Sequence, residues 1–560
     1  MTRRTSYAAV AVAALALLLP VRGTADLLAG SDPGAPPNLV TGLWLFKALL
    51  LVHAGILAVL GRVQLGEEGP RLRRPVAVPE VGHVAERLLV AALLVAAAAL
   101  RLHDLGDGLW FDEIATLAQH VRLPLGRLIS TLDSQNQHVL FSLLARGSVS
   151  ALGEGASSLR LPAAAFGVAS IWAVWWFGRI VAGRREALLA AAFLTFSYHH
   201  VWFSQNARGY TGLLFFTLVG SGLFVRLLEA REPSGWGPAV GYAVTMALAV
   251  YTHLTAVLVV LAHGLIWLGT AAGRGADPPA RRAFVRTGVG LGLAATLSLQ
   301  LYALVLPQLV GTLTEPTMAD VNVVWQNPAW LLAETARGLA AALPGGLVGL
   351  AAAGIVGAAG LAGFWRRGRA VTAVLVLPAV ATAAAILATG HNLWPRFFFF
   401  SAGAAALIVM RGLFVLGALV PGRAGDRRRA TIVTWAGVAL IAASLPALPG
   451  AWRPKQDYDG ARAWVEARRR PEDAVATVDM TDLPYRAYLR AGWASIRDAA
   501  DLDRLEAAHA RTWVLYTFPT RLAAVHPDLW RRLEGEYRPA AEFPGTVRGG
   551  SIVVLLKERT

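Results

Sequence analysis

Two adjacent carboxylates, Asp112 and Glu113, directly follow the aromatic pair Trp110-Phe111, shortly after an apolar run at 84–101. A carboxylate near a lipid surface can act as a general base on a hydroxyl group, because partial burial raises its pKa toward the working pH. The same dipeptide is also typical of a helix start, where the helix dipole favours acidic side chains. Taken alone, the local pattern favours this capping interpretation.

Other polar side chains that could take part in binding or catalysis lie at the ends of apolar runs, in the short segments that connect them. An arginine in such a segment can bind an anionic head group or a phosphate through its planar fork of donors. The alternatives are a helix cap for the histidine at 138 and interfacial snorkelling for the arginines. The candidates for substrate binding are His138, Arg208, Tyr210, His253 and Arg396.

The composition decides where these side chains must work. Of the 560 residues, 55% are hydrophobic and only 16% are charged, which is far from the composition of a soluble protein. The net charge of +16 arises almost entirely between apolar runs in the first 450 residues. This distribution is typical of cytoplasmic loops and does not indicate a nucleic-acid-binding surface. No cysteine is present, so disulfides and thiolate chemistry are excluded.

Thirteen apolar runs are long enough to predict membrane-spanning helices. If the N-terminus is cytoplasmic, alternation places every strongly basic loop on the cytoplasmic side, as the positive-inside rule requires. We therefore expect a multi-pass protein of the cell (inner or plasma) membrane. The runs lie near 7–22, 39–61, 84–101, 158–181, 187–203, 211–228, 237–252, 254–272, 287–306, 344–364, 371–389, 397–416 and 430–449.

Two apolar segments allow alternative interpretations. The first run follows Arg3-Arg4 and could be a cleaved signal peptide, but no convincing cleavage site precedes a soluble domain, which favours a retained span. The segment 139–152 is too short to span and contains Arg146, so it is interpreted as a juxtamembrane helix. Counting it as a span would place most basic loops outside.

The predicted fold is a polytopic α-helical membrane protein with a small C-terminal α/β domain outside the cytoplasm. Residues 1–83 form two helices and a basic loop, 84–450 form a transmembrane catalytic domain with a long first outer loop at 102–157, and 451–560 form the α/β domain. In the last region, helical periodicity at 458–469 and 519–534 alternates with strand-like segments at 474–478, 512–516 and 551–557.

The order of these features resembles the GT-C superfamily of membrane glycosyltransferases, in particular the protein O-mannosyltransferase and lipid A aminoarabinose transferase-like group (family 39-like). The resemblance covers roughly residues 84 to 420. Two features depart from the group: Gln137-His138-Val139 stands where its members usually have His-Pro-Pro, and two spans precede the run at 84–101. The matching stretches are Trp110-Phe111-Asp112-Glu113, Asn136-Gln137-His138-Val139-Leu140-Phe141, Leu159-Arg160-Leu161-Pro162, Ser204-Gln205-Asn206-Ala207-Arg208-Gly209-Tyr210 and Pro395-Arg396-Phe397.

The resemblance implies an inverting transfer of a sugar from a polyprenyl-phosphate carrier to a hydroxyl of a lipid, glycan or protein acceptor, at the outer face of the membrane. It implies Asp112 as the catalytic base with Glu113 as its neighbour. Basic residues would neutralise the phosphate leaving group, and Arg208, Arg396 and His138 are the candidates by position. No cofactor and no metal are expected, and the expected partners are the lipid-linked donor, the acceptor and membrane lipids, without nucleic acid.

Two other classes of protein remain open at this point. A transporter or flippase for a lipid-linked glycan would also use many spans and outer cations, although such proteins tend to place ionisable pairs in broken helices near mid-membrane. An inactive scaffold would use the C-terminal region to bind envelope partners. Release of free polyprenyl phosphate from a sugar-charged donor would distinguish the enzyme from the transporter.

Overall fold

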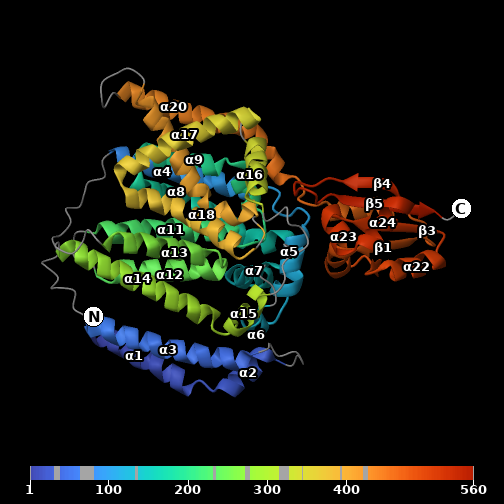
Figure 1. Ribbon diagram of the computed structural model, residues 1–560, viewed down its shortest axis with the longest axis horizontal. Coiled ribbons are helices and arrows are strands. Elements are labelled where there is room, and N and C mark those ends of the chain that lie inside the picture. Colours follow the sequence, from blue (N-terminus) through green and yellow to red (C-terminus); the bar gives the residue numbers. More distant parts are fainter. Residues whose placement is uncertain are drawn as a thin grey trace.

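The computed structural model describes most of the chain as a helical bundle with a small α/β domain at one end (Figure 1). Statements about structure below refer to these described residues. The basic loop around Arg71 and the polar residue Asn136, both used in the sequence argument, lie outside them. The described ranges are 2–30, 38–62, 81–132, 137–230, 235–271, 278–314, 327–342, 345–390, 392, 394–419 and 427–558.

An N-terminal hairpin lies along one edge of the bundle, beside α14 (Figure 1). It comprises α1 (Thr2–Leu18), α2 (Val21–Ala29) and α3 (Leu39–Arg62). The bundle comprises α4 (Val81–Leu102), α7 (Val139–Leu152), α8 (Ala156–Val181), α9 (Arg184–Thr195), α10 (Tyr198–Ser204), α11 (Tyr210–Glu229), α12 (Gly237–Thr252), α13 (Ala256–Gly269), α14 (Pro278–Tyr302), α15 (Leu306–Thr314), α16 (Pro328–Ala342), α17 (Gly346–Arg367), α18 (Arg369–Ala388), α19 (Ala402–Gly417) and α20 (Arg427–Ser444).

The apolar runs predicted from the sequence lie mainly on helical residues, because a backbone in lipid must satisfy its own hydrogen bonds. Some of them are divided between two helices, such as 7–22 between α1 and α2 and 187–203 between α9 and α10. Among the described residues, eight helices are long and apolar enough to cross a membrane, or nine if the bent pair α1 and α2 is one span. The protein is therefore a multi-pass membrane protein, while the number thirteen stays a prediction. The segment 139–152 forms α7, a helix of 14 residues that is shorter than these spans.

Small residues bring two bundle helices into direct backbone contact. Gly360 of α17 lies against the carbonyl oxygen of Ile408, and Gly412 of α19 lies against the carbonyl oxygen of Val356. A side chain at either glycine would collide with the facing backbone. The Gly and Ala bias of the apolar runs thus serves close helix packing, as is usual in membranes.

The segment 102–157, predicted as the first outer loop, forms short helices. They are α5 (Phe111–Thr116), a π-helical turn (Leu117–Val121) and α6 (Leu125–Ser130), followed by α7. Of these, α5 lies next to the C-terminal domain and α6 packs against α2 (Figure 1). Two 3-10 helices, Pro395–Ser401 and Leu445–Trp452, complete this end of the bundle. The second leads directly into the C-terminal domain.

The C-terminal domain is the predicted α/β unit, with a mixed five-stranded sheet in the order β2-β1-β3-β5-β4. β1 pairs in parallel with β2 and β3, whereas β5 pairs antiparallel with β3 and β4. Its elements are α21 (Tyr458–Glu466), β1 (Ala474–Val478), β2 (Ala494–Ile496), α22 (Ala499–Ala508), β3 (Arg511–Tyr516), α23 (Pro519–Val525), α24 (Pro527–Glu536), β4 (Arg538–Phe543) and β5 (Ile552–Glu558).

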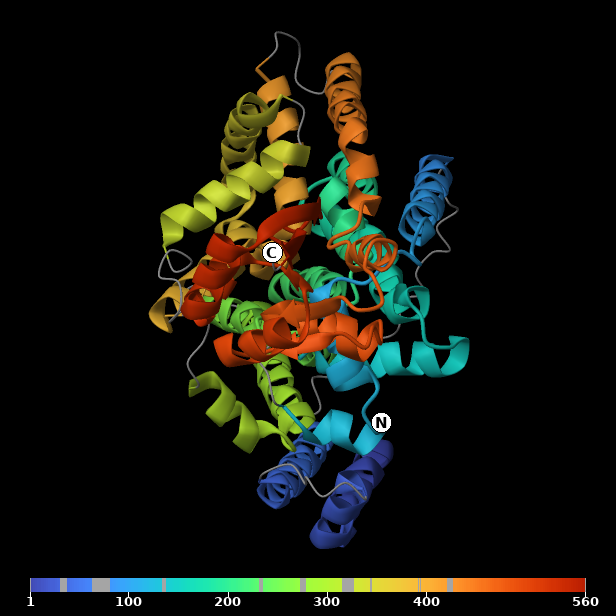
Figure 2. The same cartoon turned by 90° about the vertical axis from the view of Figure 1, so that its right-hand side faces the viewer.

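The C-terminal domain shares a hydrophobic core with the first outer loop. Leu109 and Ile114, which flank the acidic pair, pack in one buried cluster with Tyr458, Trp513 and other residues of α21 and the sheet. Figure 2, viewed from the side of this domain, shows the sheet and its helices in front of the bundle. The α/β unit therefore packs directly against the segment 102–157.

Candidate active site

The carboxylate of Asp112 lies next to Arg396 although 284 residues separate them in sequence. α5 presents Asp112 in its first turn, and the 3-10 helix Pro395–Ser401 presents Arg396. Nη1 of Arg396 donates to Oδ2 of Asp112 over 3.3 Å, and the side chains are 32% and 10% exposed, respectively. The guanidinium also lies 5.3 Å from the ring centre of Trp394. The ion pair is thus partly buried but reachable.

Arg208 and His138 form a second part of the same site. Nη1 of Arg208 donates to Oγ1 of Thr116 over 3.1 Å, and Thr116 in turn donates to the carbonyl oxygen of Asp112 over 2.8 Å. This chain of hydrogen bonds ties the loop before α11 to the helix that carries Asp112. Nη2 of Arg208 lies 3.3 Å from Nε2 of His138.

The tautomer of His138 follows from its other ring nitrogen. The backbone N–H of Gly209 donates to Nδ1 of His138 over 2.7 Å, so Nδ1 is an acceptor and the neutral ring carries its hydrogen on Nε2. Nε2 then faces a guanidinium N–H of Arg208, which is also a donor. Two donors that point into the same space are best satisfied by an oxygen that accepts from both.

Aromatic and imidazole rings line the side of the site near α11 and α12. The His253 ring lies 4.5 Å from that of His138 and 5.6 Å from that of Tyr210, between ring centres. Burial, followed by the charges of Arg208 and Arg396, lowers the pKa of His253 to about 3. The same causes, with His253 added, hold the pKa of His138 well below its usual range. Both imidazoles are therefore neutral at pH 7.

Glu113 points away from Asp112 into a fully buried ion pair. Its Oε1 accepts from Nε of Arg160 over 2.7 Å and from the backbone N–H of Ala207 over 2.7 Å, and its Oε2 accepts from Nη2 of Arg160 over 2.6 Å. Burial raises the pKa of Glu113, but the charges of Arg160 and Lys455 outweigh this effect and the pKa is lowered. Oε2 also accepts from the backbone N–H of Trp110, which is the capping role that the local sequence pattern favours.

The C-terminal domain contacts α5 and the loop before α11 through two consecutive side chains. Oε1 of Gln456 accepts from the backbone N–H of Phe111 over 3.0 Å, while its Nε2 donates to Oγ1 of Thr517 and to the carbonyl oxygen of Gly550. Nζ of Lys455 donates to the carbonyl oxygen of Gln205 over 2.7 Å. Burial lowers the pKa of Lys455 to about 7. Residues 455–456 thus hold both loops that form the site.

The structure brings six of the seven candidate residues into one cluster, and it directs Glu113 to the supporting ion pair. The sequence did not identify four supporting residues: Arg160, Thr116, Lys455 and Gln456. Arg160 lies in the stretch Leu159-Arg160-Leu161-Pro162, which matches the glycosyltransferase group. A charge inside an apolar run is a signal that could have identified it. Across the described ranges, no group of three or more His, Asp or Glu side chains is placed to hold a metal ion.

The family comparison agrees with this region of the chain. Residues 137–299 match the family model described as dolichyl-phosphate-mannose-protein mannosyltransferase. This match covers less than half of the chain and includes His138, Arg208, Tyr210 and His253. No curated protein matches the sequence.

Solved structures share the fold at low sequence identity. ArnT from Cupriavidus metallidurans, solved with undecaprenyl phosphate, is 14% identical, with a TM-score of 0.50 over 85% of this chain and 98% of that chain. The oligosaccharyltransferase AglB from Archaeoglobus fulgidus, solved with an inhibitory peptide and a dolichol-phosphate, is 11% identical, with a TM-score of 0.51 over 84% of this chain and 74% of that chain.

Residues 137–299 are thus similar to a mannosyltransferase family, and the fold is similar to that of ArnT and of the oligosaccharyltransferase AglB. The sequence motifs pointed to the same mannosyltransferase and ArnT-like enzymes. The site described above is where the chemistry of such an enzyme has to be sought.

Proposed function

We propose that this protein transfers a sugar from a polyprenyl-phosphate carrier to a hydroxyl of a lipid, glycan or protein acceptor, with inversion at the sugar carbon. The observation that carries the proposal is the placement of one carboxylate, Asp112, beside convergent N–H donors from Arg396, Arg208 and His138. A base and an anion-binding group side by side are what this reaction needs.

In the proposed reaction, the carboxylate of Asp112 accepts the proton of the acceptor hydroxyl as the oxygen attacks the anomeric carbon of the sugar. The bond from that carbon to the phosphate oxygen breaks, and polyprenyl phosphate leaves with the electron pair. Attack from the face opposite the phosphate inverts the configuration. Asp112 is the catalytic residue, and Glu113 acts through its ion pair with Arg160 as a positioning residue.

We assign the leaving phosphate to the N–H donors of Arg208 and His138. Nη2 of Arg208 and Nε2–H of His138 would both donate to one phosphate oxygen, which resolves the approach of two donors at 3.3 Å. Arg396 adds a second positive charge next to the reacting carbon, and His253 and Tyr210 provide ring surfaces that exclude water. Charge stabilisation in such a partly dry site is stronger than in water.

The proposed topology places this chemistry at the outer face of the cell membrane. The N-terminus is cytoplasmic, the thirteen apolar runs each make one crossing, and residues 451–560 are extracytoplasmic. Residues 1–83 precede the catalytic unit 84–450. The contacts of Gln456 with the first outer loop and of Lys455 with the loop before α11 support a common side for the C-terminal domain and the site.

Reconstitution in liposomes tests the proposed function. Supplied with a polyprenyl-phosphate sugar and a cell-envelope acceptor extract, the protein should release free polyprenyl phosphate together with a glycosylated product, detected by mass spectrometry. Movement of the intact donor across the bilayer without release would identify a transporter. Neither release nor movement, together with an empty donor cavity, would identify a scaffold.

Loss of the Arg208 guanidinium should weaken binding of the carrier phosphate. We expect Arg208→Gln to raise the Kd for polyprenyl phosphate about 10- to 100-fold, because hydrogen bonds to a charged group contribute about 1.5–3 kcal/mol each. Calorimetry in detergent would measure this. Arg122→Gln, which removes a surface arginine paired with Glu154 in the same outer loop, should leave the Kd unchanged. Equal affinities of the Arg208→Gln and wild-type proteins would remove Arg208 from the phosphate site.

Gln456 should act as a positioning residue for Asp112. In Gln456→Ala, the N–H of Phe111 loses its acceptor and α5 loses its tie to the sheet, so we expect kcat to fall about 10-fold with little change in KM for the donor. Thr546→Ala is the matched control, because it removes another bond to the C-terminal domain, from Trp202, without touching α5. Equal losses in both variants would indicate weakened docking in place of positioning.

A further inference from the structure

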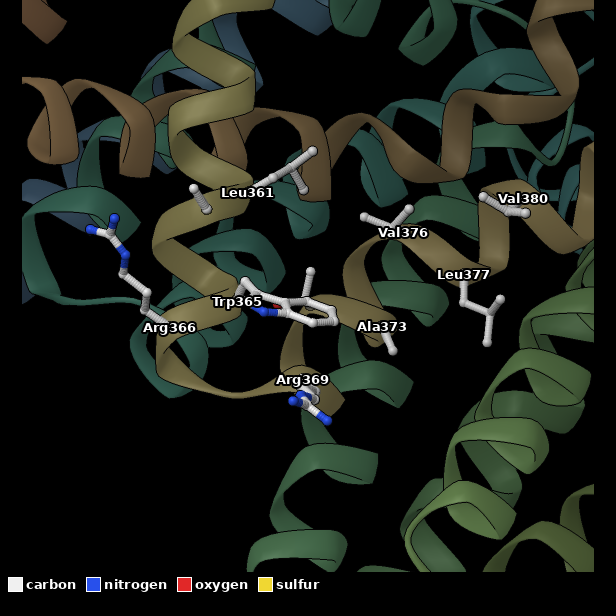
Figure 3. A pocket seen from close by; sticks show the side chains of 10 residues that line it. Leu361, Trp365, Arg366, Arg369, Ala373, Val376, Leu377 and Val380 are labelled. Carbon is white, nitrogen blue, oxygen red and sulfur yellow. The ribbon is translucent and has the colours of Figure 1, made fainter.

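A groove of about 600 Å³ runs between α17 and α18, away from the site described above (Figure 3). Leu361 and Trp365 of α17 face Ala373 and Leu377 of α18 across it. Trp365 is 56% exposed and Val380, at the far end, is 52% exposed. The groove is within the size range of small-molecule sites and has an almost wholly apolar lining.

The length of the groove matches one leaflet of a bilayer. On α18 its lining extends from Arg369 to Val380, which at 1.5 Å per residue is roughly 16 Å. Half of a hydrocarbon core is about 15 Å. The chain reaches Arg396 only after the opposite end of α18, at Ala388, so the groove opens on the side of the membrane away from Asp112. Its occupant would enter from the other leaflet.

The end of the groove at the α17–α18 turn is positively charged. The guanidinium of Arg369 lies 5.5 Å from the ring centre of Trp365, and Figure 3 shows both side chains together at this end. Arg366 also lines the groove. Within the part of the chain that the structure describes, neither arginine has an ion pair. An apolar groove with a cationic end is complementary to a lipid with an anionic head group.

We propose that this groove binds one anionic phospholipid of the leaflet opposite the active site. Its phosphate lies at Arg369, with Arg366 contributing at longer range, and one acyl chain lies between Leu361, Trp365, Ala373 and Leu377. This site takes no part in sugar transfer. A zwitterionic phospholipid fills the apolar part equally well, but its ammonium group balances the phosphate, so it lacks the net negative charge that Arg369 attracts.

Photo-crosslinking tests the proposal on the full-length protein in nanodiscs. The probe is phosphatidylglycerol with a diazirine in the acyl chain, present at trace level in phosphatidylcholine, and peptides are mapped by mass spectrometry. We expect label in the peptide 361–380, with competition by unlabelled phosphatidylglycerol but not by extra phosphatidylcholine. Arg369→Ala should lower labelling about fivefold, which corresponds to one arginine near a lipid phosphate. Ala373→Trp, which fills the groove, should abolish it.

Arg281→Ala is the matched control, because it removes an arginine from the start of α14, in a different basic segment, and should leave labelling unchanged. Size-exclusion profiles establish that each variant is folded. Three outcomes would overturn the proposal. Equal labelling by a phosphatidylcholine probe, or no effect of Arg369→Ala, would mean ordinary contact with bulk lipid. Stronger competition by polyprenyl phosphate than by phosphatidylglycerol would assign the groove to the donor.

Discussion

The Asp112→Asn protein should transfer sugar about 100- to 10,000-fold more slowly than the wild type, because an amide cannot accept the proton of the acceptor hydroxyl. Asparagine keeps the size of the side chain and an oxygen that can still accept from Nη1 of Arg396. The expected loss is therefore in kcat, while the Kd for polyprenyl phosphate should change much less. Single-turnover measurement of polyprenyl phosphate release separates the two quantities.

Asp104→Asn provides the control for this experiment. Asp104 lies in the same outer loop and makes a surface contact with His103, and its φ of 51° is one that asparagine adopts readily. The change removes the same charge near the same membrane surface. It should leave transfer intact. Full activity of Asp112→Asn in folded protein would exclude Asp112 as the base.

Glu113→Gln should have the largest effect on stability of any substitution in the site. The change leaves the guanidinium of Arg160 buried without its carboxylate, which typically costs about 3–5 kcal/mol. We expect a large fall in Tm in detergent, together with loss of activity. Glu154→Gln breaks the ion pair with Arg122, in which both side chains are partly exposed, and should cost less than about 1 kcal/mol.

The pH dependence of stability gives a second measure of the Glu113 pair. Because the pKa of Glu113 is lowered in the folded protein, its contribution is complete above the unfolded value of about 4.3. It is lost as the pH falls through the folded pKa. The wild type should therefore lose Tm on acidification below about pH 4.3 more steeply than Glu113→Gln. Parallel pH profiles would contradict the assignment of this ion pair.

The contrast between these two neighbours explains the arrangement of the site. Consecutive residues on a helix point about 100° apart, so α5 can direct one carboxylate into the reacting space and the other into its support. Glu113 binds Arg160 of α8 and Ala207 of the loop that carries Arg208. A change at Glu113 would therefore displace both the proposed base and the proposed phosphate ligand.

Local pattern was sufficient to predict much of the architecture. Lipid forces the backbone to bond within its own segment, so long apolar runs such as 211–228 and 371–389 can be read directly as helices. Short strand-like segments in the same way predicted β1, β3 and β5 of the C-terminal domain. The strands β2 and β4 were missed, because β2 has only three residues and β4 has no fully buried residue.

Tertiary contacts decided what the candidate residues can do. The sequence placed Asp112, Arg208 and Arg396 on one side of the membrane, but only the folded chain brings Arg396 to within 3.3 Å of Asp112 and turns Glu113 away from it. Gln456 had no signal in the sequence, because its role as acceptor for the backbone N–H of Phe111 depends only on its position in the fold, 345 positions further along the chain. Composition and periodicity describe each segment of the chain by itself. A site assembled from segments distant in sequence depends instead on how the helices pack.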